Sequence, residues 1–266
     1  MLQQQRPIDL TAASLMELFK NNIPAIDVAG FIAPSEMEAM INVIESHQIG
    51  EYNETVFPRI GSVGITQFEH QNDKKAYFQG VPAAKSLQQR FAQEANVDVL
   101  GRVTQALECA SGLPVRVARE DEEKEYFAGL LRVINGSAQI HADFGPHDGP
   151  SWEIGRICSQ ITWNILLRPV QGGETIVYDR SWHPPSDDQQ FRKPMSYGFS
   201  PNIIENQPFK VLTPQAGHLT LFNSRNFHEV KSLDKPHQDC RYTVSSFVGL
   251  LPASSSSEKA SLILWS

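Results

Sequence analysis

The hydrophobic positions at the start of the chain repeat at the spacing of an amphipathic helix. Leu15, Leu18 and Phe19 fall on one stripe behind Thr11, which predicts a helix capped by that threonine. The next stretch, 23–31, is short, apolar and closed by a glycine turn, and it predicts a strand.

Helical spacing dominates the rest of the first 112 residues. Residues 35–47 predict a second helix, and 82–112 predict a longer helical region. Gly101 is expected to kink that region and Gly112 to stop it, because glycine weakens a helix interior and favours its end.

From Leu113 onward the pattern changes to short runs of Val, Ile, Thr and aromatic residues between Gly, Pro, Asn and Asp turns. These runs predict at least eight strands: 115–119, 126–134, 138–143, 156–168, 173–179, 209–213, 218–222 and 241–251. Many strands behind a helical start are typical of a jelly roll, a mainly β, cupin-like double-stranded β-helix with flanking helices. We expect one domain, 1–266, with helical support in 1–112, the barrel core in 113–250 and a tail in 251–266.

Composition and charge narrow the class of protein. The chain is 41% hydrophobic and 20% charged with a net charge of −7, and it has no Lys/Arg run, so neither nucleic acid nor an anionic membrane is the expected partner. No apolar run reaches the length of a membrane span. The 3 cysteines are far apart, which indicates reduced thiols and a cytoplasmic protein. The expected partner is a small molecule, and the oligomeric state stays open.

The run QITWNILL, 160–167, has two different faces. Gln160, Thr162 and Asn164 share one face, and the residues between them are apolar. Either the polar face lines a cavity, or the strand is an ordinary half-exposed one.

Two histidines and one aspartate provide candidate metal ligands. His141 and Asp143 point to the same side of a strand end, and His228 lies 87 residues later, beyond a glycine-led strand. The His-x-Asp motif alone is weak, since a polar loop can carry the same residues. Two imidazoles and a carboxylate on one face of a metal leave three positions open, and they favour non-haem Fe(II).

Arg241 follows His228 by thirteen residues and shares a strand face with Thr243 and Ser245. An arginine with neighbouring hydroxyls forms a bidentate seat for a carboxylate. A metal with open positions beside that seat suits a keto acid that chelates iron and is anchored at its other end.

In this order and spacing, His141-x-Asp143, His228 and Arg241 resemble the Fe(II)/2-oxoglutarate-dependent oxygenases, with the likeness covering about residues 130–249. Within them, the chain is most similar to the carrier-independent amino-acid hydroxylases and halogenases. The resemblance implies hydroxylation, or another C–H oxidation, of a small polar metabolite such as an amino acid or natural-product intermediate, with Fe(II), 2-oxoglutarate and O₂.

Residue roles follow from the same resemblance. His141, Asp143 and His228 would bind iron, and Arg241 would bind the distal carboxylate of 2-oxoglutarate with Thr243 or Ser245. Asn164 or Gln160 would meet the proximal carboxylate or the substrate.

Halogenases of this group carry a small residue where this chain has Asp143, so the resemblance favours hydroxylation. Phe144 argues against a diamine substrate, because relatives acting on basic amino acids can carry an acidic residue there. His147 is either a solvated histidine or a substrate contact, and Trp265 is a candidate lid.

Three alternatives remain open from the sequence. Desaturation and ring formation use the same iron chemistry as hydroxylation. A cupin-type protein would bind metal or keto acid without turnover. A metal-dependent isomerase or hydrolase on the same barrel usually needs a fourth protein ligand, for which the sequence has no convincing candidate.

Overall fold

The computed structural model describes residues 8–53, 56–253 and 259–266. Its strands are β1 (Ala25–Val28), β2 (Gly50–Glu51), β3 (Gly61–Val63), β4 (Val115–Val117), β5 (Leu130–Val133), β6 (Ala138–His141), β7 (Ser159–Leu166), β8 (Thr175–Ser181), β9 (Phe209–Leu212), β10 (Leu219–Phe222), β11 (Asn226–Val230), β12 (Tyr242–Leu251) and β13 (Ser261–Trp265).

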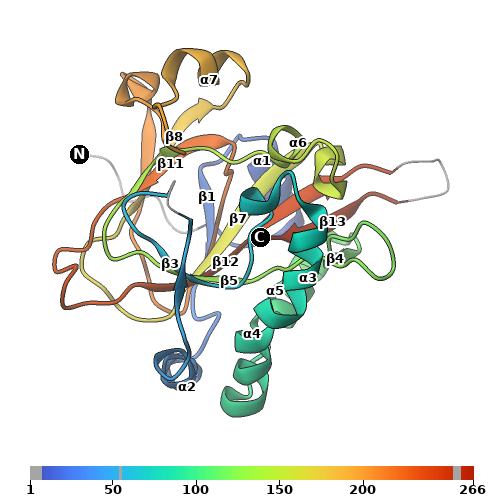
Figure 1. Ribbon diagram of the computed structural model, residues 1–266, viewed down its shortest axis with the longest axis vertical. Helices are drawn as coiled ribbons and strands as arrows, with labels where there is room; N and C mark the ends of the chain where they lie inside the picture. The colour runs from blue at the N-terminus through green and yellow to red at the C-terminus, as the bar shows by residue number, and fades with distance from the viewer. Residues whose placement is uncertain (1–7, 54–55, 254–258) are drawn as a thin grey trace.

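The α-helices are α1 (Ala12–Phe19), α2 (Pro34–Glu45), α3 (Lys74–Ala84), α4 (Ser86–Arg90), α5 (Val99–Ser111), α6 (Gly145–Asp148) and α7 (Ser186–Phe191). Short 3₁₀ helices span Phe68–His70, Glu153–Arg156 and Pro201–Ile204, and a π-helical turn spans Phe91–Ala95. Figure 1 shows α7 at one end of the molecule, beside β8 and β11, and α2 and α4 at the other.

The strands form the two sheets of a jelly roll, as the sequence predicted. The larger sheet has the order β1-β10-β7-β12-β5-β3-β2, with β13 pairing with both β12 and β4. The smaller sheet has the order β6-β11-β8-β9. Because β13 extends the larger sheet, the C-terminal segment is an integral strand and not the expected tail.

The main core lies between the larger sheet and the N-terminal helices. Ile161, Trp163 and Ile165 of β7 join Leu15 and Leu18 of α1 in one buried cluster. Each of these side chains is at most 1% exposed. Burying a side chain of this size contributes about 1.5–3 kcal/mol. The apolar face of β7 therefore fixes the sheet against the helices and leaves its polar face turned inward.

Two helical predictions can be compared with the structure. Thr11 caps α1 as expected, with its hydroxyl accepting from the backbone N–H of Ser14. The helical region is interrupted at Asn96, whose φ of 54° ends the π turn, and not at Gly101. Gly101 lies in the first turn of α5, where its N–H donates to the carboxylate of Asp98. Gly101 therefore belongs to the capped start of a helix, and the predicted kink at this residue is wrong.

Candidate metal centre and co-substrate cavity

Strand pairing brings the three candidate metal ligands together. His141 ends β6 and lies directly opposite His228 of β11, so the two rings meet across the sheet with centroids 4.2 Å apart. Asp143 follows β6, and its backbone N–H donates to the carbonyl of Ser224 at 2.9 Å. One ligand atom from each of the three residues lies within 4.8 Å of the others. They are the one His/Cys/Asp/Glu group of metal-binding geometry among the described residues.

Both imidazoles are oriented by the backbone. Nδ1 of His141 donates to the carbonyl of Gln139 at 2.6 Å, and Nδ1 of His228 donates to the carbonyl of Asn226 at 2.9 Å. Each bond places the proton on Nδ1 and leaves Nε2 as the ligand atom. Nε2 of His228 lies 3.6 Å from Oδ2 of Asp143.

The electrostatics of the triad suit a cation. Burial, with His141 nearby, lowers the pKa of His228 well below its usual value, so its ring is neutral and free to coordinate. Burial raises the pKa of Asp143, although His141 and Arg132 oppose this. A half-buried carboxylate beside two imidazoles is a fitting donor set for a divalent metal.

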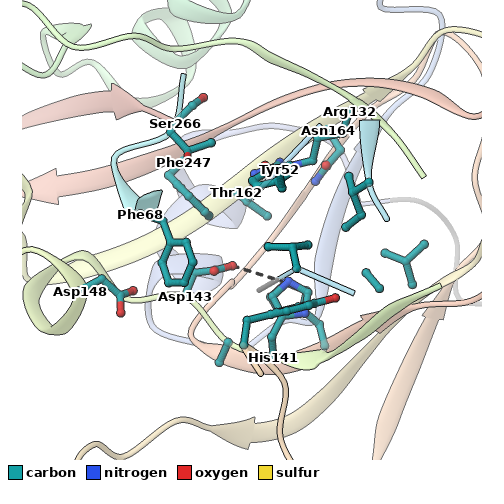
Figure 2. Close-up of a pocket in the computed structure, with 18 of the residues that line it drawn as sticks. Tyr52, Phe68, Arg132, His141, Asp143, Asp148, Thr162, Asn164, Phe247 and Ser266 are labelled. Atoms are coloured by element: carbon teal, nitrogen blue, oxygen red, sulfur yellow. Dashed lines mark hydrogen bonds and ion pairs between the residues drawn. The ribbon is translucent and has the colours of Figure 1, made fainter. Parts of the chain in front are cut away.

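The triad lies in a cavity of about 170 Å³ that extends between the two sheets. The polar face of β7 faces this cavity, since Gln160, Thr162 and Asn164 all line it. The half-exposed reading of that strand is therefore wrong. Figure 2 shows Asp143 and His141 in the middle of the cavity, with Arg132 and Asn164 on one side and Asp148 on the other.

One end of the cavity holds two arginines, the half-buried Arg132 and the buried Arg241. Arg241 is 6% exposed, and its Nε and the hydroxyl of Thr243 have no hydrogen-bond partner in the described chain. Burial, and then the charge of Arg132, lower the pKa of Arg241 to about 10. A buried, unpaired guanidinium is costly unless an anion meets it. This end therefore has the charge and the hydrogen-bond donors that suit a carboxylate.

Ser245 and Gln160 have partners within the protein. The Ser245 hydroxyl accepts from Arg132, whose Nε also donates to the hydroxyl of Tyr52 at 2.9 Å. Gln160 accepts from the N–H of Gly145 at 2.7 Å and donates to the carbonyl of Asp143 and the hydroxyl of Ser224. Both residues help to hold the site together, and Gln160 also lines the cavity. Asn164 lines the cavity, and its side chain has no protein hydrogen bond among the described residues.

The three candidate substrate residues lie in different surroundings. Phe144 is absent from the described lining of the cavity and packs under the guanidinium of Arg225, 4.4 Å from its ring. His147 also lies outside that lining and packs edge-on against Trp182. Trp265 lines the cavity, but it is 2% exposed within β13, so it forms a wall and not a lid.

Sequence reasoning missed Arg132, Asp148 and Gln67, which all line the cavity. Arg132 pairs with Thr243 in the register of β5 and β12. Its position as a lone charge in an apolar strand was a usable signal, because a charge there needs a partner. Asp148 and Gln67 lie in short irregular segments whose direction depends on tertiary packing.

Comparison with known proteins identifies the family. Residues 5–266 match the family of the carrier-protein-independent halogenase WelO5. This chain belongs to that family. It is therefore an enzyme of the Fe(II)- and 2-oxoglutarate-dependent oxygenase superfamily, as the motif predicted, and it uses Fe(II), 2-oxoglutarate and O₂.

Individual relatives of this WelO5-family chain agree with the assignment. It is 54% identical over 218 residues to leucinostatins biosynthesis cluster protein S of Purpureocillium lilacinum, covering 81% of this chain and 89% of that one. It is 32% identical over 107 residues to L-gamma-glutamyl-L-propargylglycine hydroxylase of Streptantibioticus cattleyicolor, covering 39% and 38%.

Among solved structures, an N-substituted L-amino acid dioxygenase of Burkholderia ambifaria in complex with alpha-KG shares the fold. Its TM-score is 0.55 at 17% identity, over 95% of this chain and 90% of that one. Among the described residues, no helix has the length and apolar character needed to cross a membrane.

Proposed function

We propose that this enzyme hydroxylates a C–H bond of a small amino-acid or peptide-like intermediate of natural-product biosynthesis, and does not halogenate it. The observation that carries the proposal is the carboxylate of Asp143, which lies with His141 and His228 in one ligand set. In halogenases of the group a small residue leaves that position to a halide, whereas Asp143 occupies it here.

The residues at the cavity divide the work between them. His141, Asp143 and His228 would hold the iron, which activates O₂ when bound while 2-oxoglutarate supplies the electrons. The overall reaction converts substrate C–H, 2-oxoglutarate and O₂ into C–OH, succinate and CO₂. Gln160 positions the segment that carries Asp143, since it bonds both to that residue's carbonyl and to Gly145.

Recognition of 2-oxoglutarate is assigned to the end of the cavity that holds Arg132 and Arg241, called the arginine end below. Arg241 and the hydroxyl of Thr243 would bind its distal carboxylate, because both have unpaired buried polar atoms. Arg132 adds a second positive charge to this end and is held by Tyr52 and Ser245. Asn164 is the free amide of the polar β7 face, and we assign it to the proximal carboxylate.

The substrate class is supported by the relatives. The protein from P. lilacinum belongs by name to a leucinostatin biosynthesis cluster, and the S. cattleyicolor protein is named as a hydroxylase of a γ-glutamyl amino acid. Desaturation or ring formation at the same site remains the second candidate reaction, because it requires the same ligand set. Binding without turnover and metal-dependent isomerisation or hydrolysis gain no support from the family match.

The decisive experiment supplies Fe(II), 2-oxoglutarate, O₂ and excess chloride and bromide to the enzyme with a panel of amino acids and short peptides. Mass spectrometry should find products that gain one oxygen and no halogen. Asp143→Gly should lose hydroxylation, whereas Asp121→Gly in an exposed loop should retain it. A halogenated product from the unaltered enzyme would overturn the proposal.

A further inference from the structure

The cavity extends past the metal triad to a second polar end that the reaction with 2-oxoglutarate does not use. In Figure 2, Asp148 and Phe68 lie on the side of Asp143 away from Arg132 and Asn164, with Phe247 and Ser266 above them. Because 2-oxoglutarate is assigned to the arginine end, this second end is left for the substrate.

Asp148 offers a free acceptor at this end. Its Oδ2 accepts from the backbone N–H of Phe144 at 3.1 Å, and its Oδ1 has no protein partner in the described chain. Arg192, whose charge lowers the pKa of Asp148, donates instead to Asp188, at 2.5 Å from Nη2 to Oδ1. Burial, reinforced by Asp143, raises the pKa of Asp148 to about 7. A carboxylate in this setting gains from a cationic or N–H donor in the ligand.

Gln67 offers an unpaired amide next to it. Its side chain lines the cavity, is 3% exposed, and has no hydrogen bond within the described residues, with Nε2 fully buried. A Cβ placed on Gly149, the residue after Asp148, would lie 2.9 Å from this nitrogen, so the amide is directed at the same segment. Its backbone is fixed by an N–H bond to the carbonyl of Ser266 at 2.8 Å. A buried amide without partners is costly and signals a missing acceptor.

The surrounding walls are apolar. Phe247 and Trp265 pack together with centroids 5.5 Å apart, and Phe68 is 45% exposed where it lines the cavity. Aromatic walls of this kind suit a hydrocarbon side chain, and the two polar groups then fix its orientation.

We propose that Asp148 and Gln67 form the recognition site for an α-aminoacyl unit, with the substrate's ammonium on Asp148 and its carbonyl oxygen on Gln67 Nε2. An apolar side chain of the substrate packs on Phe68, Phe247 and Trp265. The inference rests on the proposed function, because it assigns the other end of the cavity to 2-oxoglutarate. It names as substrate an amino-acid amide or a peptide with a free amino terminus.

The test measures binding to the metal-free protein by calorimetry or ligand-observed NMR, so it needs no turnover. The probes are L-leucinamide, its analogue 2-hydroxy-4-methylpentanamide, which lacks the amine, and 3-methylbutylamine, which lacks the carbonyl. L-leucinamide should bind at least about tenfold more tightly than either analogue, because each loses a hydrogen bond to a buried group.

Variants of Asp148 and Gln67 test which residue causes the preference for the amine and which causes the preference for the carbonyl. Asp148→Asn keeps an acceptor for the Phe144 N–H and should abolish the preference for the amine. Gln67→Leu should abolish the preference for the carbonyl. Asp121→Asn, which alters an exposed carboxylate outside the cavity lining, should retain both preferences. Thermal unfolding confirms that each variant is folded.

Equal binding of all three probes, failure of every probe to bind, or preferences that survive in Asp148→Asn and Gln67→Leu would each overturn the inference. A parallel titration with Zn(II) and 2-oxoglutarate reports separately on the proposed function. If only that function is wrong, the stabilisation by Zn(II) and 2-oxoglutarate is missing, while the preference for L-leucinamide remains.

Discussion

The buried charge of Arg241 should lower the free energy of unfolding of the metal-free protein. Arg241→Met removes that charge and should therefore raise the free energy of unfolding. The pKa of this guanidinium falls from 12.5 to about 10 on folding. A base with a lowered folded pKa disfavours folding at every pH below that value, so the full penalty is present at neutral pH. Each pKa unit corresponds to about 1.4 kcal/mol, which sets an upper bound of about 3.5 kcal/mol on the penalty.

Water in the cavity reduces that bound, and we expect a gain of about 1–2 kcal/mol for Arg241→Met. For a protein of this size the gain raises the unfolding temperature by about 2–8 °C. Methionine keeps the apolar stem of the side chain and removes the charge. Arg241→Lys keeps a charge and should gain less. Arg119→Met, at a side chain that is 46% exposed, should change nothing.

Ligand binding should make the unaltered protein more stable than Arg241→Met, the reverse of the order without ligands. Zn(II) and 2-oxoglutarate at about one hundred times the dissociation constant stabilise the unaltered protein by about 2.7 kcal/mol. Arg241→Met should lose the 2-oxoglutarate part of that stabilisation. Differential scanning fluorimetry of both proteins, with and without ligands, measures the crossover. A less stable metal-free Arg241→Met, or an unchanged response to 2-oxoglutarate, would refute the assignment of Arg241 as an unpaired anion seat.

Three further predictions concern other positions. Asp148 has a folded pKa of about 7, above its unfolded value, so its contribution to stability is lost as pH rises through about 4 to 7. Asp148→Asn should thus be about 1–3 kcal/mol more stable than the unaltered metal-free protein near pH 8 and equal to it near pH 4, by denaturant titration; a constant difference would contradict this. Gln160→Leu leaves three polar partners unpaired, and it should weaken Zn(II) binding about 10- to 100-fold, which competition with a chelator measures. Unchanged affinity would remove its positioning role. Trp265→Ala should cost about 3–5 kcal/mol, because the ring is buried in the wall of the cavity. A loss below about 1 kcal/mol would show that the ring moves freely, as a lid does.

The periodicity of the chain was enough to predict the jelly roll and the two unlike faces of β7, and it left open whether the polar face lines a cavity. The alternation of polar and apolar residues in 160–167 follows from the pleat of the strand alone. A local sequence pattern therefore predicted which side chains share a face of the sheet. The break in the N-terminal helices was misplaced because Gly101 lies at the capped start of α5, a position where glycine costs little. Strand β13 was missed because five residues near a chain end give too short a pattern.

The metal ligands were predictable because His-x-Asp and a later histidine keep their order in the sequence. The partners of Gln160 and Ser245 were not, since each depends on which side chain a neighbouring strand brings opposite. Phe144 and His147 were placed in the site by their closeness to Asp143 in sequence. The chain turns through α6 there, and it brings Asp148 to the cavity in their place.

The central claim is that the His141, Asp143 and His228 triad holds iron that binds 2-oxoglutarate anchored on Arg241. An anaerobic titration of the metal-free enzyme with Fe(II) and then 2-oxoglutarate, followed by visible absorption, tests it most directly. A weak charge-transfer band should form only when both are present and should be absent in Asp143→Ala. Failure to form the band in the unaltered protein, or its persistence in Asp143→Ala, would contradict the account.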